Sequence, residues 1–184
     1  MQRHILITGA TSGIGPATCR KFIEKCPETS FSFALLGRRI DRLAGAKQAL
    51  QDKASIHIFP LDVRDPAAVL DYLRACLRDE GREIFKVIFL DKGNRILKDT
   101  DMFEGTVDQA AVYVREIIKL ALRLNATALI LTHNHPSGRP EPSPEDVRIT
   151  EEIRCACRPL GLEVLDHIVV GADGYYSFRE QGRL

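Results

Sequence analysis

Two histidines and an aspartate are the residues whose types and spacing point most directly to chemistry. His133 and His135 stand two residues apart after the aliphatic run "ALILT", and Asp146 follows eleven residues after His135. Because side chains alternate along a strand, both imidazoles should project from the same face of a sheet. Two histidine nitrogens and a carboxylate suit a catalytic Zn²⁺ site, in which water takes the fourth position.

The segment before Asp146 contains a helix start that would return the carboxylate to the histidines. In "PEPSPED", Ser143 suits the N-cap, Pro144 the first helical position and Asp146 the third. Taken separately, an HxH pair is most simply a surface or partly buried pair, and Asp146 a helix-capping residue. The full spacing, HxH, seven residues, Ser143, two residues and Asp146, favours a metal site.

This spacing resembles the JAMM signature of the JAB/MPN metalloproteins, and "HNHPSGRPEPSPED" is similar to their RadC-like branch. The resemblance runs over residues 66–184 and includes six further stretches: "EIFKVIFLD", "GTVD", "REIIKLAL", "ATALILTHNHPSG", "LEVLDHIVVG" and "SFREQGRL". One departure is Val114, where the branch commonly has proline before Arg115. Another is that full-length RadC proteins usually carry a helical DNA-binding segment before this domain, where this sequence has a different one.

The resemblance implies a role for each residue of the motif. His133, His135 and Asp146 would be zinc ligands, and Ser143 would lie near the oxyanion. JAMM enzymes also hold the zinc-bound water with a glutamate at the start of a strand, in an "ExF" setting that Glu83 matches. The chemistry needs this carboxylate because zinc lowers the pKa of its water to about 7, and a base must pass the proton to the leaving amine. The alternative for Glu83 is an ordinary residue at an exposed strand edge.

Four other polar residues near these motifs have simpler interpretations. Glu104 and Glu116 are weaker candidates for the base, since Glu116 falls inside an expected helix at a spacing that suits pairing with Lys119. His167, among aliphatic residues in "LDHIVV", is expected to be a hydrogen-bonded core histidine, with a further metal ligand as the alternative. Asn134 should point away from the histidines and tie down the neighbouring loop.

The first 65 residues carry a different element, the glycine-rich stretch "TGATSGIG" at residues 8–15. Glycines between a strand and a helix let backbone N–H groups approach a pyrophosphate. Together with "GRR" and "LDV" after the next two strands, the stretch resembles the short-chain dehydrogenase/reductase family and implies NADP. The implied positions are phosphate-loop glycines, an arginine for the 2'-phosphate and two residues beside the adenine: Gly9, Gly13, Gly15, Arg38 or Arg39, Asp62 and Val63.

The dehydrogenase resemblance ends near residue 65. Hydride transfer to a carbonyl needs a proton donor beside it, yet the further strands, the catalytic serine and the Tyr-x-x-x-Lys pair of that family are missing from the sequence. Each of the 4 tyrosines is followed, four residues on, by a residue other than lysine. We interpret residues 1–65 as a truncated segment, with residual nucleotide binding as the alternative.

Periodicity and resemblance together predict an α/β protein in two parts. Strands alternating with helices predict a partial Rossmann-like βαβαβ unit over residues 1–65, with a parallel sheet. A connecting helix is expected over residues 66–82, capped by Asp65. Residues 83–184 should form a JAB/MPN-type α/β sandwich around a central mixed sheet, with helices at 106–125 and 143–161.

Composition limits the partners and the cellular compartment that we expect for this protein. The 26 basic and 25 acidic residues give a net charge of +1, which offers no general attraction to nucleic acid and argues mildly against DNA. The apolar runs are too short to span a bilayer, and no signal-peptide core precedes the first glycine, so we expect a cytoplasmic protein without membrane contact. The 5 cysteines are odd in number and irregularly spaced, which favours structural thiols.

Three functions follow from these observations. The leading one is a zinc-dependent JAMM-type metallohydrolase that cleaves a peptide or isopeptide bond in a peptide or protein substrate through a metal-activated water. The alternatives are a RadC-like accessory module, associated with DNA repair or protein binding and with little hydrolysis, and a nucleotide-binding remnant. A zinc deaminase is set aside because it would need HxE and PCxxC motifs. No sequence feature specifies an oligomeric state.

Overall fold

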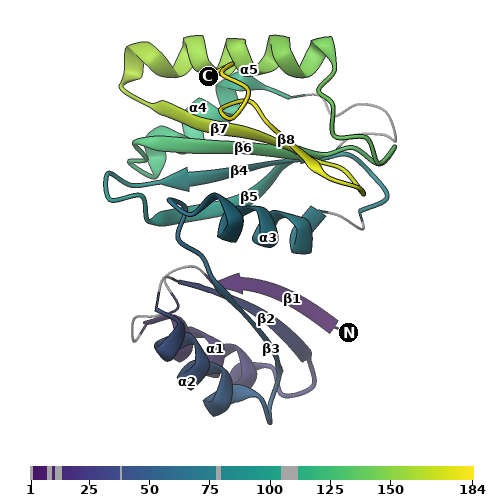
Figure 1. Cartoon of the computed structure of the whole chain (residues 1–184). Helices are drawn as coiled ribbons and strands as arrows, with labels where there is room; N and C mark the ends of the chain where they lie inside the picture. The colour runs from purple at the N-terminus through teal and green to yellow at the C-terminus, as the bar shows by residue number, and fades with distance from the viewer. Residues whose placement is uncertain (1, 8–9, 11–13, 38, 78–79, 105–111) are drawn as a thin grey trace. The chain divides into compact units, whose positions relative to one another are not determined.

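The computed structural model describes residues 2–7, 10, 14–37, 39–77, 80–104 and 112–184. The chain divides into two compact units, Met1–Tyr72 and Leu73–Leu184. The boundary falls inside helix α3 (Pro66–Leu77), the connecting helix of the sequence prediction (Figure 1).

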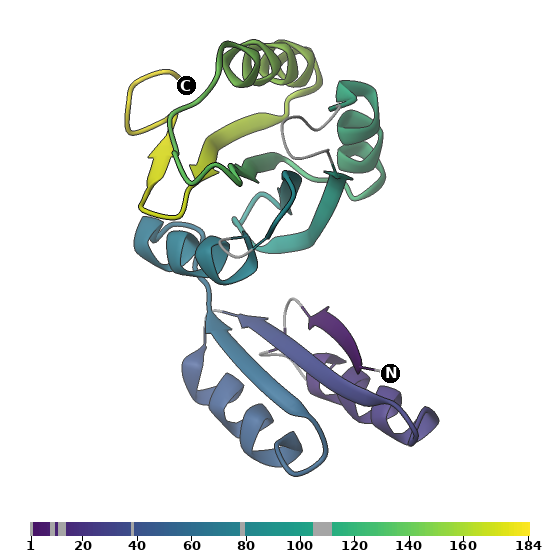
Figure 2. The same ribbon diagram turned by 90° about the vertical axis from the view of Figure 1, so that its right-hand side faces the viewer.

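The first unit is the predicted parallel βαβαβ arrangement. Its elements are β1 (Gln2–Ile7), α1 (Ile14–Lys25), β2 (Ser30–Gly37), α2 (Ile40–Leu50) and β3 (Ser55–Pro60). The strand order β1-β2-β3 makes β2 the central strand, and both neighbours pair with it in parallel. Phe33 and Leu35 of β2 are completely buried, as is Leu43 of α2. Both helices contact β2 and also contact each other, so they lie on one face of the sheet (Figure 2).

Helix α3 begins as the sequence predicts and ends before residue 80. The Asp65 carboxylate accepts a hydrogen bond from the Ala67 amide at 3.0 Å, which satisfies an N–H group of the first turn. Its described part runs to Leu77, residues 78–79 lie outside the described residues, and residues 80–82 are no longer helical. The carbonyls of Glu80 and Arg82 instead accept hydrogen bonds from the Asn134 side chain, which leads the chain into the next strand.

The second unit is built around a mixed sheet of five strands. These are β4 (Ile84–Leu90), β5 (Ile96–Glu104), β6 (Ala128–Asn134), β7 (Glu163–Val170) and β8 (Tyr175–Ser177). Their order is β5-β4-β6-β7-β8; β6 and β7 are parallel and the other pairs antiparallel. Every residue of the central strand β6 is buried. The predicted central mixed sheet is therefore confirmed.

Helices α4 (Val114–Arg123) and α5 (Pro144–Cys157) complete the hydrophobic core of this unit. The core joins Phe85, Val87 and Phe89 of β4 and Leu129 and Leu131 of β6 to buried residues of both helices: Ile117, Ala121, Ile149, Ile153 and Cys157. A short 3₁₀ turn, Arg158–Leu160, follows α5. One face of the sheet is thus covered by α4 and α5, and this face carries the site.

Helix α4 starts later than predicted. The sequence suggested a helix from residue 106, but Val112 and Tyr113 are outside the helix, and residues 105–111 lie outside the described part of the chain. The Tyr113 backbone is extended, with φ −102° and ψ 100°. Val114 is therefore the first helical residue. This is the position that proline favours, which accounts for the proline of the resembled branch.

Candidate metal centre

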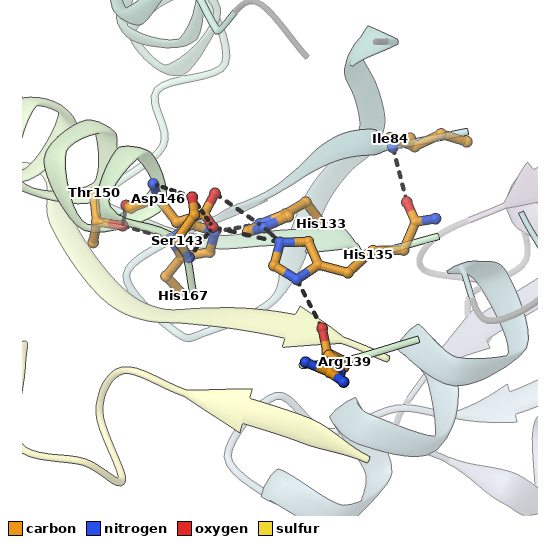
Figure 3. Close-up of polar contacts among 9 residues, drawn as sticks. Ile84, His133, His135, Arg139, Ser143, Asp146, Thr150 and His167 are labelled. Atoms are coloured by element: carbon orange, nitrogen blue, oxygen red, sulfur yellow. Dashed lines mark hydrogen bonds and ion pairs between the residues drawn. The ribbon is translucent and has the colours of Figure 1, made fainter. Parts of the chain in front are cut away.

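The end of β6 and the first turn of α5 bring three metal-binding side chains together (Figure 3). His133 Nε2 lies 3.1 Å from Asp146 Oδ1, and His135 Nε2 lies 3.4 Å from Asp146 Oδ2. The two histidine Nε2 atoms are 3.0 Å apart. His133 is completely buried and His135 partly exposed, so the cluster has one side open to solvent.

The donor set fits a zinc ion. Bonds of about 2.0–2.2 Å in a tetrahedron place two donor atoms roughly 3.3 Å apart, close to the separations found here. Two neutral imidazoles and one carboxylate suit Zn²⁺ and leave a fourth position free. The described structure therefore contains a candidate three-ligand site at the residues that the sequence selects.

The start of α5 holds the aspartate through a reciprocal cap. The Asp146 amide donates to Ser143 Oγ at 3.2 Å, while Asp146 Oδ2 accepts from the Ser143 amide and hydroxyl, each at 2.7 Å. Pro144 occupies the first turn, as predicted. A capping box of this kind satisfies helix N–H groups and fixes the side chain at the third helical position. The same contacts that begin the helix therefore aim Asp146 at the histidines.

The electrostatics of the cluster without metal favour a charged aspartate. Burial alone would raise the pKa of Asp146, but the contacts of its carboxylate with His133, His135 and Ser143 outweigh burial and hold that pKa well below its usual range. The hydrogen bond to Asp146 raises the pKa of His135, with burial opposing and the charges of Asp146 and Glu83 adding to the rise. The charged carboxylate of Asp146 thus favours a cation between it and the two histidines, as a metal site requires.

The outer nitrogen of each histidine has a hydrogen-bond partner. His135 Nδ1 lies 2.8 Å from the carbonyl oxygen of Arg139, and His133 Nδ1 lies 2.9 Å from His167 Nε2. His167 is completely buried and stacks on Phe178, so it is the hydrogen-bonded core histidine that the sequence suggested. Partners of this kind set the orientation of metal-binding imidazoles.

Glu83 lies directly before β4, beside the cluster. Phe85, two residues after Glu83, pairs with His133. Glu83 is half-buried, and its charge contributes to the raised pKa of His135. Asn134 anchors this segment because its side chain accepts from the Ile84 amide at 2.8 Å and donates to the Arg82 carbonyl at 2.9 Å.

The loop between the ligands packs against the turn after β7. Gly138, with φ +86°, adopts a conformation that favours glycine. Its carbonyl accepts a hydrogen bond from the Ala172 amide at 3.0 Å, and the His135 amide donates to the Val170 carbonyl at 2.9 Å. A surface hollow of about 660 Å³ adjoins the site; its lining includes His135, Arg139, Glu141 and Asp173.

Two further candidates for the base, Glu116 and Glu104, lie on α4 and at the end of β5. Glu116, a partly exposed residue of α4, forms an ion pair with Lys119 at 3.5 Å, the pairing that its helical spacing predicts. Glu104 is the last residue of β5, where it pairs with Ile84.

Most of the nucleotide-binding candidates give little structural information. Gly9, Gly13 and Arg38 lie outside the described residues. A Cβ atom at Gly15 would come within 2.7 Å of the Ala10 backbone, so this position needs glycine for packing. Asp62 accepts hydrogen bonds from Arg64, and Arg39 forms an ion pair with Asp41 at 3.6 Å. NADP binding therefore stays a prediction.

Sequence reasoning missed Thr150, whose hydroxyl lies 2.6 Å from His167 Nδ1. Its position four residues after Asp146, on the same helix face, was the available signal.

None of the described helices combines the length and apolar character that a bilayer crossing requires.

Comparisons with known proteins divide the chain in a similar way. Residues 63–183 match the RadC-like JAB domain, and residues 3–82 match the short chain dehydrogenase family. L-sorbose reductase from Gluconobacter frateurii, solved in complex with NADPH and L-sorbose, shares 18% identity at a TM-score of 0.33, over 88% of this chain and 66% of that one.

Relatives of the second part carry the name UPF0758 protein. The Idiomarina loihiensis protein is 48% identical over 120 residues, which cover 65% of this chain and 54% of that protein. A Vibrio vulnificus protein is 55% identical over 111 residues, covering 60% and 50%. The chain thus spans about half the length of these relatives. With about two thirds of its residues matching that domain, this chain belongs to the RadC-like JAB family, preceded by a short-chain dehydrogenase-like segment.

Proposed function

We propose that the second unit is a zinc-dependent metallohydrolase that cleaves a peptide or isopeptide bond. The observation that carries the proposal is the convergence of His133, His135 and Asp146 at one partly open point. The position of Glu83 directly before β4, and the effect of its charge on the pKa of His135, support its role in this proposal. A closed structural zinc site uses four protein ligands, whereas three ligands with an open side suit hydrolysis.

Each residue has a chemical task in this proposal. His133, His135 and Asp146 hold the zinc, which when bound supplies a Lewis acid that makes water a nucleophile near neutral pH. Glu83 takes the proton from the attacking water and passes it to the leaving amine, since an amine leaves readily only when protonated. The Asn134 hydrogen bonds on either side of Glu83 keep the backbone of this base in place.

Ser143 is suited to the reacting carbonyl. Its hydroxyl contacts the metal-facing carboxylate of Asp146 at 2.7 Å, and Ser143 as a whole is an exposed residue. By rotating its hydroxyl hydrogen, it would donate to the oxygen that becomes negatively charged during attack. Ser143 therefore combines helix capping with stabilisation of the oxyanion.

The substrate approaches from the open side of the cluster. The hollow beside His135 is lined by Arg139, Glu141 and Asp173, which offer both charge signs to a chain of amide groups. A polar peptide or a protein tail suits this lining better than an apolar small molecule. The substrate class is thus a peptide or protein.

A base substitution tests this function. Zinc-loaded wild-type protein and a Glu83→Gln variant would be incubated with a panel of peptides and isopeptide-linked peptides, with products read by mass spectrometry. We expect cleavage by the wild type and a loss of about 10²–10⁴-fold in Glu83→Gln, with the zinc content unchanged. Glu116→Gln is the matched control, since Glu116 pairs with Lys119 on α4, and it should cleave normally.

Two results would contradict the proposal. Equal cleavage by Glu83→Gln and the wild type would remove Glu83 from its role. Zinc-loaded wild type that leaves the whole panel intact would instead favour an accessory module that keeps the metal without hydrolysis.

A further inference from the structure

A continuous line of hydrogen bonds runs from the buried metal-facing histidine to the backbone of α5. His133 Nδ1 lies 2.9 Å from His167 Nε2, and His167 Nδ1 lies 2.6 Å from Thr150 Oγ1. The Thr150 hydroxyl in turn contacts the carbonyl oxygen of Asp146, one helical turn earlier. The line therefore starts at one candidate ligand and ends at the backbone of another (Figure 3).

The direction of each hydrogen bond follows from the last contact. A carbonyl oxygen has no proton, so the Thr150 hydroxyl must donate its single proton to Asp146. Thr150 Oγ1 can then only accept from His167, so His167 carries its proton on Nδ1. A neutral imidazole has one N–H group, which leaves His167 Nε2 as an acceptor for the Nδ1–H group of His133.

We propose that Thr150, acting through His167, fixes the tautomer of His133 in which Nδ1 is protonated and Nε2 presents its lone pair to the metal. Thr150 and His167 are then positioning residues for the site. This inference rests on the proposed function, because it concerns how the same site accepts zinc. It assigns a task to a hydroxyl that lies on α5, away from the metal-facing atoms.

The surroundings of His167 support a neutral ring. The side chain is completely buried, stacks on Phe178 with ring centroids 5.0 Å apart, and meets the edge of Phe85 at 5.6 Å. A completely buried imidazole between two aromatic rings is favoured in its neutral form, because burial penalises the charged form. An uncharged His167 transmits the hydroxyl's orientation instead of donating from both nitrogens.

The tautomer of the other metal-facing histidine, His135, is fixed by a backbone carbonyl. His135 Nδ1 contacts the Arg139 carbonyl at 2.8 Å, and a carbonyl accepts only from N–H. The Arg139 backbone alone thus holds His135 in the Nδ1-protonated form. His133 Nδ1 lacks such a fixed acceptor, because its partner is a second imidazole that could face either way. On the other side of the ring, Asp146 Oδ1 lies 3.1 Å from His133 Nε2 and would accept from an Nε2–H group. In the zinc-free protein the Nδ1-protonated form of His133 therefore depends on the hydrogen bonds from Thr150 through His167. This difference makes His133 the ligand that depends on Thr150.

The tautomers can be read directly in the zinc-free protein. We would record two-bond ¹H–¹⁵N correlation spectra of the ¹⁵N-histidine-labelled full chain at about pH 9, where histidine is neutral, and assign the 5 histidines by substitution. We expect His133 of the wild type to be protonated on Nδ1. In Thr150→Val, His167 is free to reverse, so His133 should show a mixture of both tautomers, whereas Thr150→Ser should restore the wild-type pattern.

Two internal comparisons separate positioning from general damage. His135 should keep its Nδ1–H form in every variant, because the Arg139 carbonyl is unchanged. Thr132→Val removes another buried threonine hydroxyl, on the strand residue next to His133. Among the described residues Thr132 Oγ1 has no hydrogen-bond partner, so this variant should leave the His133 tautomer unaltered.

Zinc affinity supplies the second readout. Competition with a chromophoric chelator should give a zinc Kd about 10–100-fold weaker for Thr150→Val, with Thr150→Ser and Thr132→Val near the wild type. The inference is overturned if wild-type His133 is protonated on Nε2, or if Thr150→Val keeps both the wild-type tautomer and the wild-type Kd. Absence of zinc binding in all four proteins would reject the proposed function, while the zinc-free spectra would still decide the tautomer.

Discussion

At the scale of single residues, His135 links the charge of the site to pH. Its pKa is raised above the usual 6.5 by its hydrogen bond to Asp146, so in the zinc-free fold it keeps a proton that the unfolded chain has lost. This proton stabilises the zinc-free protein fully below the unfolded value, and its contribution is lost as pH rises through the raised pKa. Zinc affinity has the opposite dependence on pH, because zinc binds the deprotonated imidazole ring.

We therefore predict opposite trends between about pH 6 and about pH 9. The thermal midpoint of the zinc-free protein should fall as pH rises through the raised pKa of His135, while zinc affinity should rise over the same interval. Differential scanning fluorimetry with chelator and zinc titrations at each pH would measure both. A His135→Ala variant should lose this part of the midpoint change, and a zinc affinity that is flat with pH would contradict the prediction.

The ligand residues were predictable from sequence, but their hydrogen-bond partners were not. His133, His135, Ser143 and Asp146 lie within fourteen consecutive residues, so strand alternation and a capping pattern were enough to bring them together. The partner of His133 comes from another strand. No local pattern shows that His167 and Thr150 meet, because that contact depends on how α5 packs over β7.

At the scale of elements, an irregularity in β7 turns His167 toward the site. The pairing of β6 with β7 shifts between Leu129 and Ile130, so that Val164 pairs with Leu129 while His167 pairs with Leu131. Regular alternation would place Val164 and His167 on opposite faces, since they are three residues apart. The extra residue puts both on the α5 face, which is a known effect of bulges near functional sites.

The turn after β7 is a second element that shapes the site. A Cβ atom at Gly171 would lie 2.3 Å from the Gly138 carbonyl oxygen and 2.9 Å from the Pro140 nitrogen, and both are backbone atoms of the motif loop. Gly171→Ala should push this loop away, and with it the Arg139 carbonyl that orients His135. We expect a loss of about 1–3 kcal/mol in stability and a weaker zinc Kd, measured by chemical unfolding and chelator competition.

Gly174→Ala, in the same turn, is the matched control. Its Cβ atom would make an ordinary 3.8 Å contact with the Pro140 side chain. Stability and zinc affinity of this variant should stay near the wild type. Equal effects of the two substitutions would show that the turn as a whole, rather than the close approach at Gly171, matters.

The start of α4 gives a stability prediction. Val114 is the first helical residue, and Tyr113 before it is extended, which is the conformation that a following proline requires. Val114→Pro should therefore raise the free energy of unfolding by about 0.4–1 kcal/mol, since proline restricts the unfolded chain. Urea denaturation would measure the change. A lower free energy of unfolding in Val114→Pro would contradict this prediction. It would mean that the Val114 amide donates a hydrogen bond that the helix needs.

At the scale of the whole molecule, the two units differ in how much of each was predictable. The alternating pattern of strands and helices predicted the parallel order of the first unit, and the buried strand "ALILT" predicted the central position of β6. Element ends were less accurate, as α3 and α4 show, because they depend on contacts such as those of Asn134 with the Arg82 carbonyl. Distant side chains made these contacts, and local sequence does not contain them.

All candidate ligands and their hydrogen-bond partners belong to the second unit, so one metal ion per chain is expected. The most direct test is elemental analysis of the purified full chain beside His133→Ala/His135→Ala, with His57→Ala, an exposed histidine of β3, as the control. We predict about one zinc per chain in the wild type and His57→Ala, and none in the double variant. A wild type that takes up no zinc on dialysis, or a double variant that retains it, would contradict the metal centre described here.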